Sequence, residues 1–160
     1  MPETVSWART FTQKVVLRFL YIYSGCNVVS TYLGGVVFLS GDSMQPTIQG
    51  GDVVATRTFR PRVHKVEKGQ IVCVKSPTDP GLLVCKRVAA LEHERVGNVV
   101  IEGHSVNPRV AKGHVFLLGD NLDSSTDSRQ YGPVPMGLIH SKVVFRVWPP
   151  HRIGWLNDSA

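Results

Sequence analysis

The stretch LSGDSMQPTIQGGDVV, residues 39–54, places a serine inside a stiff polar loop that directly follows a long uncharged segment. Pro46 fixes its own φ and biases Gln45 toward extended backbone, so these residues suit neither a helix nor an unbroken strand. A loop that proline and glycine hold in one shape around a small hydroxyl is either a tight turn between strands or a place where chemistry is done. Ser43 is therefore a candidate nucleophile that needs a base.

Composition narrows the classes of protein to consider. The chain has 160 residues, which predicts one domain, and a formal net charge of +6. Its basic residues are scattered and are not interleaved with aromatic residues, so the charge does not predict a nucleic-acid interface. No His-x-x-x-His motif or carboxylate pair stands at ligand spacing, and we therefore expect neither a metal nor another cofactor.

Cysteine usage gives no strong signal. The chain has three cysteines, Cys26, Cys73 and Cys85, and no Cys-x-x-Cys motif. They predict neither a zinc cluster nor a disulfide framework. A pair between Cys73 and Cys85 stays open, and small apolar strand residues are the simpler interpretation.

The N-terminal part contains 21 consecutive positions, residues 19–39, without a charged side chain. About 20 residues cross the apolar core of a bilayer, so this segment predicts a membrane anchor. A buried helix of a soluble protein is an alternative, because serine, asparagine and glycine interrupt the segment; a cleaved signal would have a shorter apolar region. Arg9, Lys14 and Arg18 precede the segment, which favours an N-terminus on the side of synthesis or the matrix. The scarcity of acids there also suits an internal mitochondrial address.

After residue 40, short runs of β-forming residues alternate with turn residues, which indicates a mainly β domain. We expect strands at residues 52–58, 70–75, 82–90, 98–102, 114–118 and 141–148. Gly97 and Asn98 predict a hairpin turn within the stretch HERVGNVVIEG.

The base for Ser43 could be a histidine or a lysine. The histidines are spread over expected loops and strand ends without a matching acid: His64, His93, His104, His114, His140 and His151. Lys86 lies in the middle of the apolar run LLVCKRVAAL, and burial would favour its neutral form, which can act as a base. Only one of Lys86 and Arg87 can point inward from a strand, so a solvent-facing Lys86 is the other interpretation.

A third segment, GHVFLLGDNLDSSTDSRQYGPVP, runs from an expected strand into a turn crowded with side chains that bond local backbone. By itself it is an elaborate turn. Taken with SGDSMQPTI, VEKGQIVCVKSP and CKRV in this order, it resembles the type I signal peptidases, which are membrane-anchored serine/lysine peptidases. The resemblance covers residues 40 to 150, approximately, and looks closest to the mitochondrial inner membrane proteases of the subunit 1 type.

The resemblance implies a role for each matching residue. Ser43 matches the nucleophile, Lys86 the general base, and Ser125 a hydroxyl that orients the lysine amine. Asp127 and Arg129 match an ion pair that supports the turn.

The oxyanion hole is where the sequence departs from the bacterial pattern. Those enzymes have a serine two residues before the nucleophile, and this chain has Gly41 there. The resemblance then implies that the Ser43 N–H acts with another donor, such as Ser40 or a water. It also implies that Gly119, Asp120 and Asn121 shape the backbone beside the site.

Together these observations predict a mainly β, signal-peptidase-like catalytic domain after one membrane-spanning helix. The expected divisions are a basic segment at 1–18, an anchor at 19–39, a peptidase domain at 40–150 and a tail at 151–160. The resemblance implies cleavage of sorting presequences, bound as extended peptides at a strand edge, from proteins delivered to the mitochondrial intermembrane space.

The resemblance further implies a single-pass protein of the mitochondrial inner membrane whose catalytic domain faces the intermembrane space. Its partner would be a subunit 2 type peptidase, in a heterodimer. The alternative is a catalytically silent membrane-anchored β module that stabilises a peptidase complex, although such a module would have no need to keep Ser43, Lys86 and Ser125 together.

Overall fold

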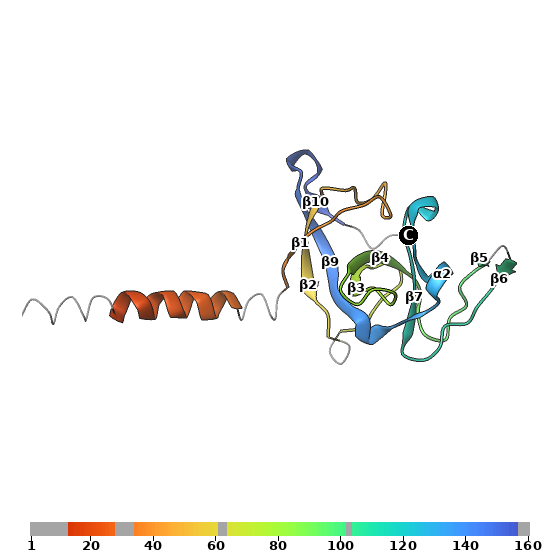
Figure 1. Ribbon diagram of the computed structural model, residues 1–160, viewed down its shortest axis with the longest axis horizontal. Helices are drawn as coiled ribbons and strands as arrows, with labels where there is room; N and C mark the ends of the chain where they lie inside the picture. The colour runs from red at the N-terminus through yellow and green to blue at the C-terminus, as the bar shows by residue number, and fades with distance from the viewer. Residues whose placement is uncertain (1–12, 28–33, 61–63, 102–103, 157–160) are drawn as a thin grey trace, which may run out of the picture. The chain divides into compact units, whose positions relative to one another are not determined.

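The computed structural model describes residues 13–27, 34–60, 64–101 and 104–156 (Figure 1). The chain divides into two compact units, residues 1–34 and residues 35–160. We describe each unit by itself.

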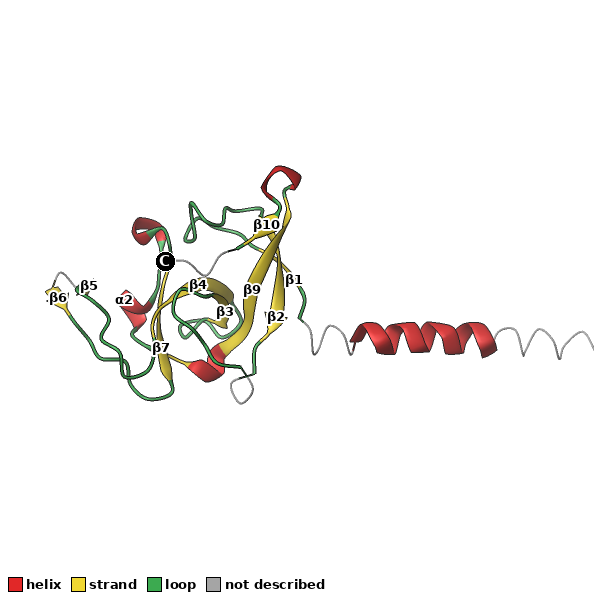
Figure 2. Cartoon of the chain, turned by 180° about the vertical axis from the view of Figure 1, so that it is seen from behind, coloured by secondary structure: helices red, strands yellow, loops and turns green. Residues whose placement is uncertain are grey.

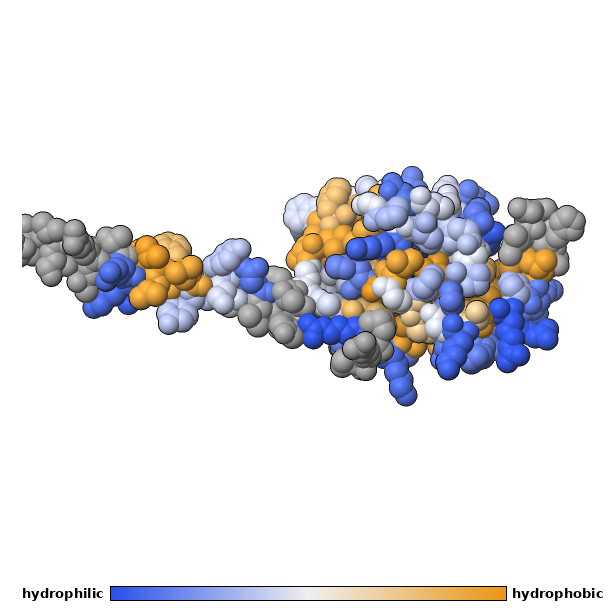
Figure 3. All heavy atoms as spheres, turned by 60° about the horizontal axis from the view of Figure 1, so that its bottom comes forward, coloured by the Kyte–Doolittle hydropathy of each residue, from blue (hydrophilic) through white to orange (hydrophobic). Residues whose placement is uncertain are grey.

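The described part of the first unit is a helix of residues 13–27. Figure 3 shows orange apolar side chains along this helix. Its exposed large hydrophobic residues are Val16, Leu17, Phe19, Leu20, Tyr21, Ile22 and Tyr23. Among the described residues, the structure contains no helix with both the length and the apolar character needed to cross a membrane.

The expected anchor of residues 19–39 ends differently in the structure. Residues 28–33 lie outside the described residues. Val36–Phe38 form strand β1, which pairs antiparallel with β2 (Val53–Thr58). A short run of β-branched and aromatic residues can satisfy its backbone groups in a sheet as well as in a helix, so apolar content alone did not locate this boundary. The expected end of the helical segment at residue 39 is therefore wrong.

The second unit is built on one antiparallel sheet, which confirms the mainly β expectation. In the described residues the sheet has eight strands in the order β1-β2-β9-β3-β4-β7-β8, and β10 pairs with β9. The strands not yet bounded are β3 (Ile71–Lys75), β4 (Leu83–Ala90), β7 (His114–Leu118), β8 (Val134–Pro135), β9 (Ile139–Trp148) and β10 (Gly154–Trp155). Figure 2 shows how strongly these strands bend, with loops and short helical turns connecting them.

The centre of the sheet is buried on both faces. Four of the five residues of β3, Ile71, Val72, Cys73 and Val74, are buried. Such a continuous apolar run is typical of an interior strand. It separates two groups of packed side chains, one around Met44, Ile48 and Cys85 and the other around Val88, Leu117 and Val134.

The six expected strands all exist, with ends that differ by no more than a few residues. The predicted hairpin turn at Gly97 and Asn98 is wrong, however. The strand β5 (Val99–Ile101) pairs with β6 (His104–Val106), so its partner follows it along the chain instead of preceding Gly97. Glycine at the first of two central positions suits a type II′ turn, so the dipeptide alone permits a hairpin that the pairing of β5 with β6 does not use.

The predicted division at residue 150 is also wrong, because the sheet continues past it. Gly154 pairs with Arg146 and Trp155 pairs with Phe145, and the two aromatic rings meet edge to face at 5.1 Å. Leu156 is buried in the same core group as Met44. The residues after Pro150 therefore complete the core group that contains Met44.

We predict that Leu156→Ala destabilises the second unit by about 2 to 5 kcal/mol, because it leaves a cavity in a packed core. Ile153→Ala is the matched control: Ile153 is 54% exposed, and its change should stay within about 0.5 kcal/mol. Urea unfolding followed by tryptophan fluorescence measures both. Equal effects of the two changes would show that the C-terminal segment is not part of the core.

Candidate active site

The connection between β1 and β2, residues 39–52, carries Ser43, and we call it the Ser43 loop. The Leu39 N–H donates to the Asp52 carbonyl at 2.9 Å, which closes the base of the loop. Met44 and Ile48 are buried in the core beneath it. Ser43 is half-buried, because its buried neighbour Met44 holds it at the boundary between core and solvent.

The turn after β7 holds the backbone of the Ser43 loop. The Asn121 N–H donates to the Ser43 carbonyl at 3.0 Å, and Asn121 Nδ2 donates to the Asp42 carbonyl at 3.2 Å. Gly119 permits this close approach. A Cβ at Gly119 would lie 2.5 Å from both the Ser43 carbonyl oxygen and the Ser125 Cβ, too close for either to remain in place. The turn and the loop therefore meet through a residue that must lack a side chain.

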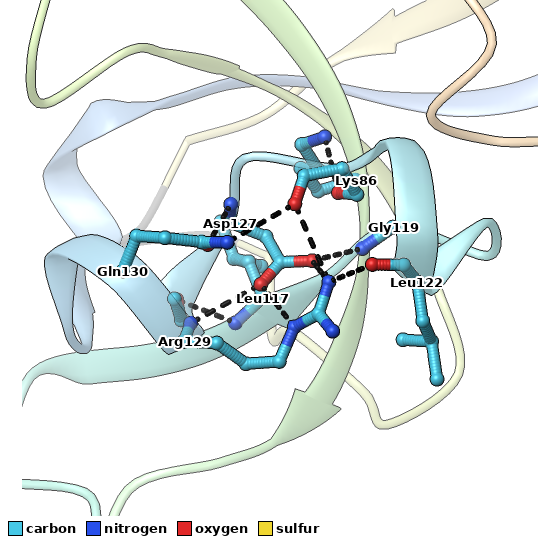
Figure 4. A network of polar contacts seen from close by, with 9 residues as sticks. Lys86, Leu117, Gly119, Leu122, Asp127, Arg129 and Gln130 are labelled. Carbon is cyan, nitrogen blue, oxygen red and sulfur yellow. Dashed lines mark hydrogen bonds and ion pairs between the residues drawn. The ribbon is translucent and has the colours of Figure 1, made fainter. Parts of the chain in front are cut away.

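Lys86 points into the protein from the middle of β4. Its side chain belongs to a residue that is only 3% exposed, and Nζ donates to Ser125 Oγ at 2.8 Å. Figure 4 shows this amine above the network formed by the turn. Burial lowers the pKa of Lys86, and the nearby Asp127 carboxylate opposes that effect only in part. A lysine in this setting gives up its proton more readily than one in water.

Arg87, the neighbour of Lys86, takes the other side of the strand. Its Nε and Nη2 donate to the two carboxylate oxygens of Asp120 at 2.8 and 2.7 Å. Nη1 donates to the Gly69 carbonyl at 2.8 Å. The alternation of the strand is therefore resolved: Lys86 is the inward residue, and Arg87 forms a partly exposed ion pair.

Asp127 is the fully buried centre of the turn that carries Ser125. Its carboxylate accepts from the Gly119 N–H at 3.0 Å and from Arg129 Nε and Nη2 at 2.9 and 3.0 Å. It also caps α2 (Ser128–Tyr131), with Gln130 closing a reciprocal capping box. Figure 4 shows the Arg129 guanidinium lying along this carboxylate. The expected pair of Asp127 and Arg129 is thus present as a bidentate contact.

The charge of Asp127 is fixed by its partners. Burial alone would raise the pKa of this carboxyl, but hydrogen bonds from the Arg129 guanidinium and from the Gly119 and Arg129 backbone N–H groups outweigh burial and hold the pKa below its usual range. Arg129 Nη2 also donates to the carbonyls of Leu122 at 2.6 Å and Ser125 at 3.3 Å. The backbone on both sides of Ser125 is therefore tied to one buried ion pair.

Ser43 and Lys86 line the same pocket, which has a volume of about 310 Å³. Its other walls come from β1, the Ser43 loop, the middle of β3 and the first half of β4, including Leu39, Met44, Cys73 and Val84. Among the described residues, Lys86 Nζ makes one hydrogen bond, and this bond goes to Ser125 and not to Ser43. The structure thus brings a serine hydroxyl and a buried amine to one pocket.

The expected oxyanion donors lie on the same loop. Ser40 is exposed and lines the pocket, as does Gly41. Gly41 has φ of +90°, a conformation that favours glycine over any residue with a side chain. In the described part of the chain the Ser43 N–H donates to no other group.

Three charged residues that the sequence analysis did not single out also hold the Ser43 loop. Asp52 is 2% exposed and lies 3.5 Å from Arg146 Nε and 3.3 Å from Arg152 Nη1. Arg146 Nη2 donates to the Thr47 carbonyl at 2.7 Å. The position of Asp52, a charged residue at the start of an apolar strand, was a signal in the sequence that it has a structural role. Its arginine partners gave no such signal, because they lie about 100 positions away along the chain.

The described residues contain no group of three or more His, Cys, Asp or Glu side chains that could hold a metal ion. No described histidine side chain takes part in the polar network around Lys86.

We predict that Gly119→Ala destabilises the second unit by about 1 to 3 kcal/mol, because the added Cβ must push apart the Ser43 loop and the Ser125 turn. Gly137→Ala is the matched control, since a Cβ there would meet no atom within 4 Å. Denaturant unfolding of both variants gives the comparison. If Gly119→Ala is as stable as Gly137→Ala, the close approach of loop and turn is not present in solution.

Comparison with known proteins gives the family. The signal peptidase, peptidase S26 family matches residues 12–108 and 97–148. Mitochondrial inner membrane protease subunit 1 from Mus musculus is 45% identical over 132 residues, covering 80% of this chain and 78% of the relative. Subunit 2 from the same organism is 33% identical over 160 residues, covering 95% of this chain and 89% of the relative.

A crystal structure of a signal peptidase I from Enterococcus faecalis V583 aligns with a TM-score of 0.42 and 23% identity, covering 50% of this chain and 97% of that one. The higher identity to subunit 1 than to subunit 2 agrees with the resemblance noted in the sequence. Because the family matches most of the chain and the relatives are similar over most of its length, this chain belongs to the signal peptidase, peptidase S26 family.

Proposed function

We propose that this chain is a serine endopeptidase that removes sorting presequences through a Ser43/Lys86 dyad. The observation that carries the proposal is the buried Lys86 amine, which donates to Ser125 Oγ in a pocket shared with Ser43. No described histidine offers a comparable base. Membership of the signal peptidase family supports a peptidase reaction.

The mechanism begins with the neutral Lys86 amine. A neutral amine keeps two N–H donors and one lone pair, so donation of one N–H to Ser125 Oγ limits the directions in which the lone pair can point. The lone pair removes the proton of Ser43 as the hydroxyl attacks the scissile carbonyl. Lys86 then gives this proton to the leaving amine, which leaves an acyl-enzyme on Ser43.

Deacylation uses the same groups with water as the nucleophile. Lys86 removes a proton from the water that attacks the acyl carbon, and the proton returns to Ser43 as the acid product leaves. The negative oxygen that forms in each step would meet the Ser43 N–H, which no other described group uses. Ser40 is the proposed second donor, because it lines the pocket beside Gly41.

The proposed location and partner rest on the names of the relatives, and the proposed substrates rest on the resemblance described in the sequence analysis. Those relatives are called mitochondrial inner membrane protease subunits 1 and 2. We propose that this chain is anchored in the mitochondrial inner membrane by its uncharged N-terminal segment, with residues 40 onward in the intermembrane space, and that it pairs with a subunit 2 type peptidase. An anchor next to the Ser43 loop would keep the nucleophile near the membrane surface, where tethered presequences are cut.

The test uses the full chain, with and without a subunit 2 type partner, and precursors of intermembrane-space proteins. We predict a new precursor N-terminus, mapped by mass spectrometry. Ser43→Ala should lower the rate by at least about a thousandfold, because no group replaces the nucleophile. Lys86→Arg should lower it by a similar factor, because a guanidinium stays protonated and cannot serve as a base.

Lys75→Arg is the matched control, since Lys75 is exposed at the end of β3 and should tolerate the change. Unfolding curves confirm that each variant is folded. A folded Lys86→Arg protein with substantial activity would contradict the dyad. No cleavage by the folded wild-type chain together with its partner would favour the silent, complex-stabilising module.

A further inference from the structure

Two thiols lie opposite each other in the wall of the candidate active-site pocket. Cys73 of β3 and Cys85 of β4 are directly paired in the antiparallel register (Figure 1 shows the two strands side by side). Both are reduced and buried, with exposures of 1% and 8%, and both line the pocket that contains Ser43. The mechanism proposed above uses neither of them.

The register is suitable for a bond between the two sulfurs. Residues opposite each other in an antiparallel pair have Cα atoms about 4.5 or 5.5 Å apart, and disulfides join Cα atoms about 4.4 to 6.8 Å apart. Residues directly opposite each other on neighbouring strands place their side chains on the same face of the sheet, so the two thiols are neighbours. Interaction with the Cys85 thiol lowers the pKa of Cys73 against the opposing effect of burial, whereas interaction with Cys73 and burial raise the pKa of Cys85.

The two cysteines also pack where a change would reach the nucleophile. They belong to the core group that contains Met44 and Ile48. Met44 directly follows Ser43, and Ile48 lies on the same loop. A bond between the two sulfurs changes how both side chains pack beneath Met44 and Ile48, and a close-packed core passes such a change on to the Ser43 loop.

We propose that Cys73 and Cys85 are an oxidation site for a hydroperoxide, and that the resulting disulfide lowers the activity of the adjacent site. The Cys73 thiolate attacks the terminal oxygen of the hydroperoxide, whose O–O bond breaks to give a sulfenic acid and an alkoxide, or hydroxide from hydrogen peroxide, which takes up a proton and leaves as an alcohol or water. The Cys85 sulfur then attacks the Cys73 sulfur, and the second oxygen leaves as water. Two electrons pass from the dithiol to the hydroperoxide, and a thiol reductant reverses the change.

The test treats the Cys26→Ser full chain with hydrogen peroxide, because Cys26 is exposed and could link separate molecules. A non-reducing digest should yield a cross-linked peptide pair containing Cys73 and Cys85, and alkylation should detect no remaining thiol. The further change Cys85→Ser should abolish the cross-link, because no second thiol can attack Cys73. The peptide that contains Cys73 should then carry an oxidised cysteine, which the reduced dithiol does not show.

The effect on activity rests on the function proposed above, whereas the cross-link does not. With a presequence peptide as substrate, we expect oxidation to lower kcat/KM at least fivefold and dithiothreitol to restore it, with no such loss in Cys85→Ser. If the reduced chain has no activity, the proposed function fails while the peptide map still reports on the thiols. Absence of the cross-link would overturn the oxidation site, and a full cross-link with unchanged kcat/KM would overturn its effect on activity.

Discussion

The hydrogen bond from the buried Lys86 amine to Ser125 Oγ is the interaction on which the candidate site depends. A lysine in the middle of an apolar strand is unfavourable as a cation unless it is paired, and the carboxylate nearest in the network, Asp127, is already engaged by Arg129. Lys86 is therefore left with a neutral hydroxyl partner instead of a direct counter-ion. That arrangement holds the amine in place while burial keeps its pKa low, which are the two properties that a general base requires.

The remainder of the second unit can be understood as support for this pair of groups. The turn after β7 is fixed from within by Asp127, and through Gly119 and Asn121 it holds the backbone of Ser43. The far end of the Ser43 loop is held separately by Arg146 at the Thr47 carbonyl. The two ends of the Ser43 loop are therefore fixed by different parts of the chain. Ser43 and Lys86 can line one pocket without a hydrogen bond between them.

Sequence patterns predicted the parts of this arrangement that depend on local chemistry. The strand around Lys86, the turn around Asp127 and the stiff loop around Ser43 each carry their own signal, and the order of these segments indicated the family. The patterns could not locate β1, because an uncharged apolar run suits either a helix or a strand. They also could not reveal the arginines that bind the Ser43 loop, or the packing of Leu156, because those contacts join positions about 100 residues apart, whose pairing depends on the order of strands in the sheet.

The most direct test of the central claim is the ionisation of Lys86 itself. NMR titration of the chain with ¹³C-labelled lysine side chains, with the Lys86 signal assigned by its absence in Lys86→Arg, follows the Cε shift of each lysine as pH rises. Lys86 should titrate below the ordinary lysine pKa of about 10.4, because burial lowers its pKa. A Lys86 that titrates together with the exposed lysines would contradict the account, because it would remain a cation at the pH at which Ser43 must be activated.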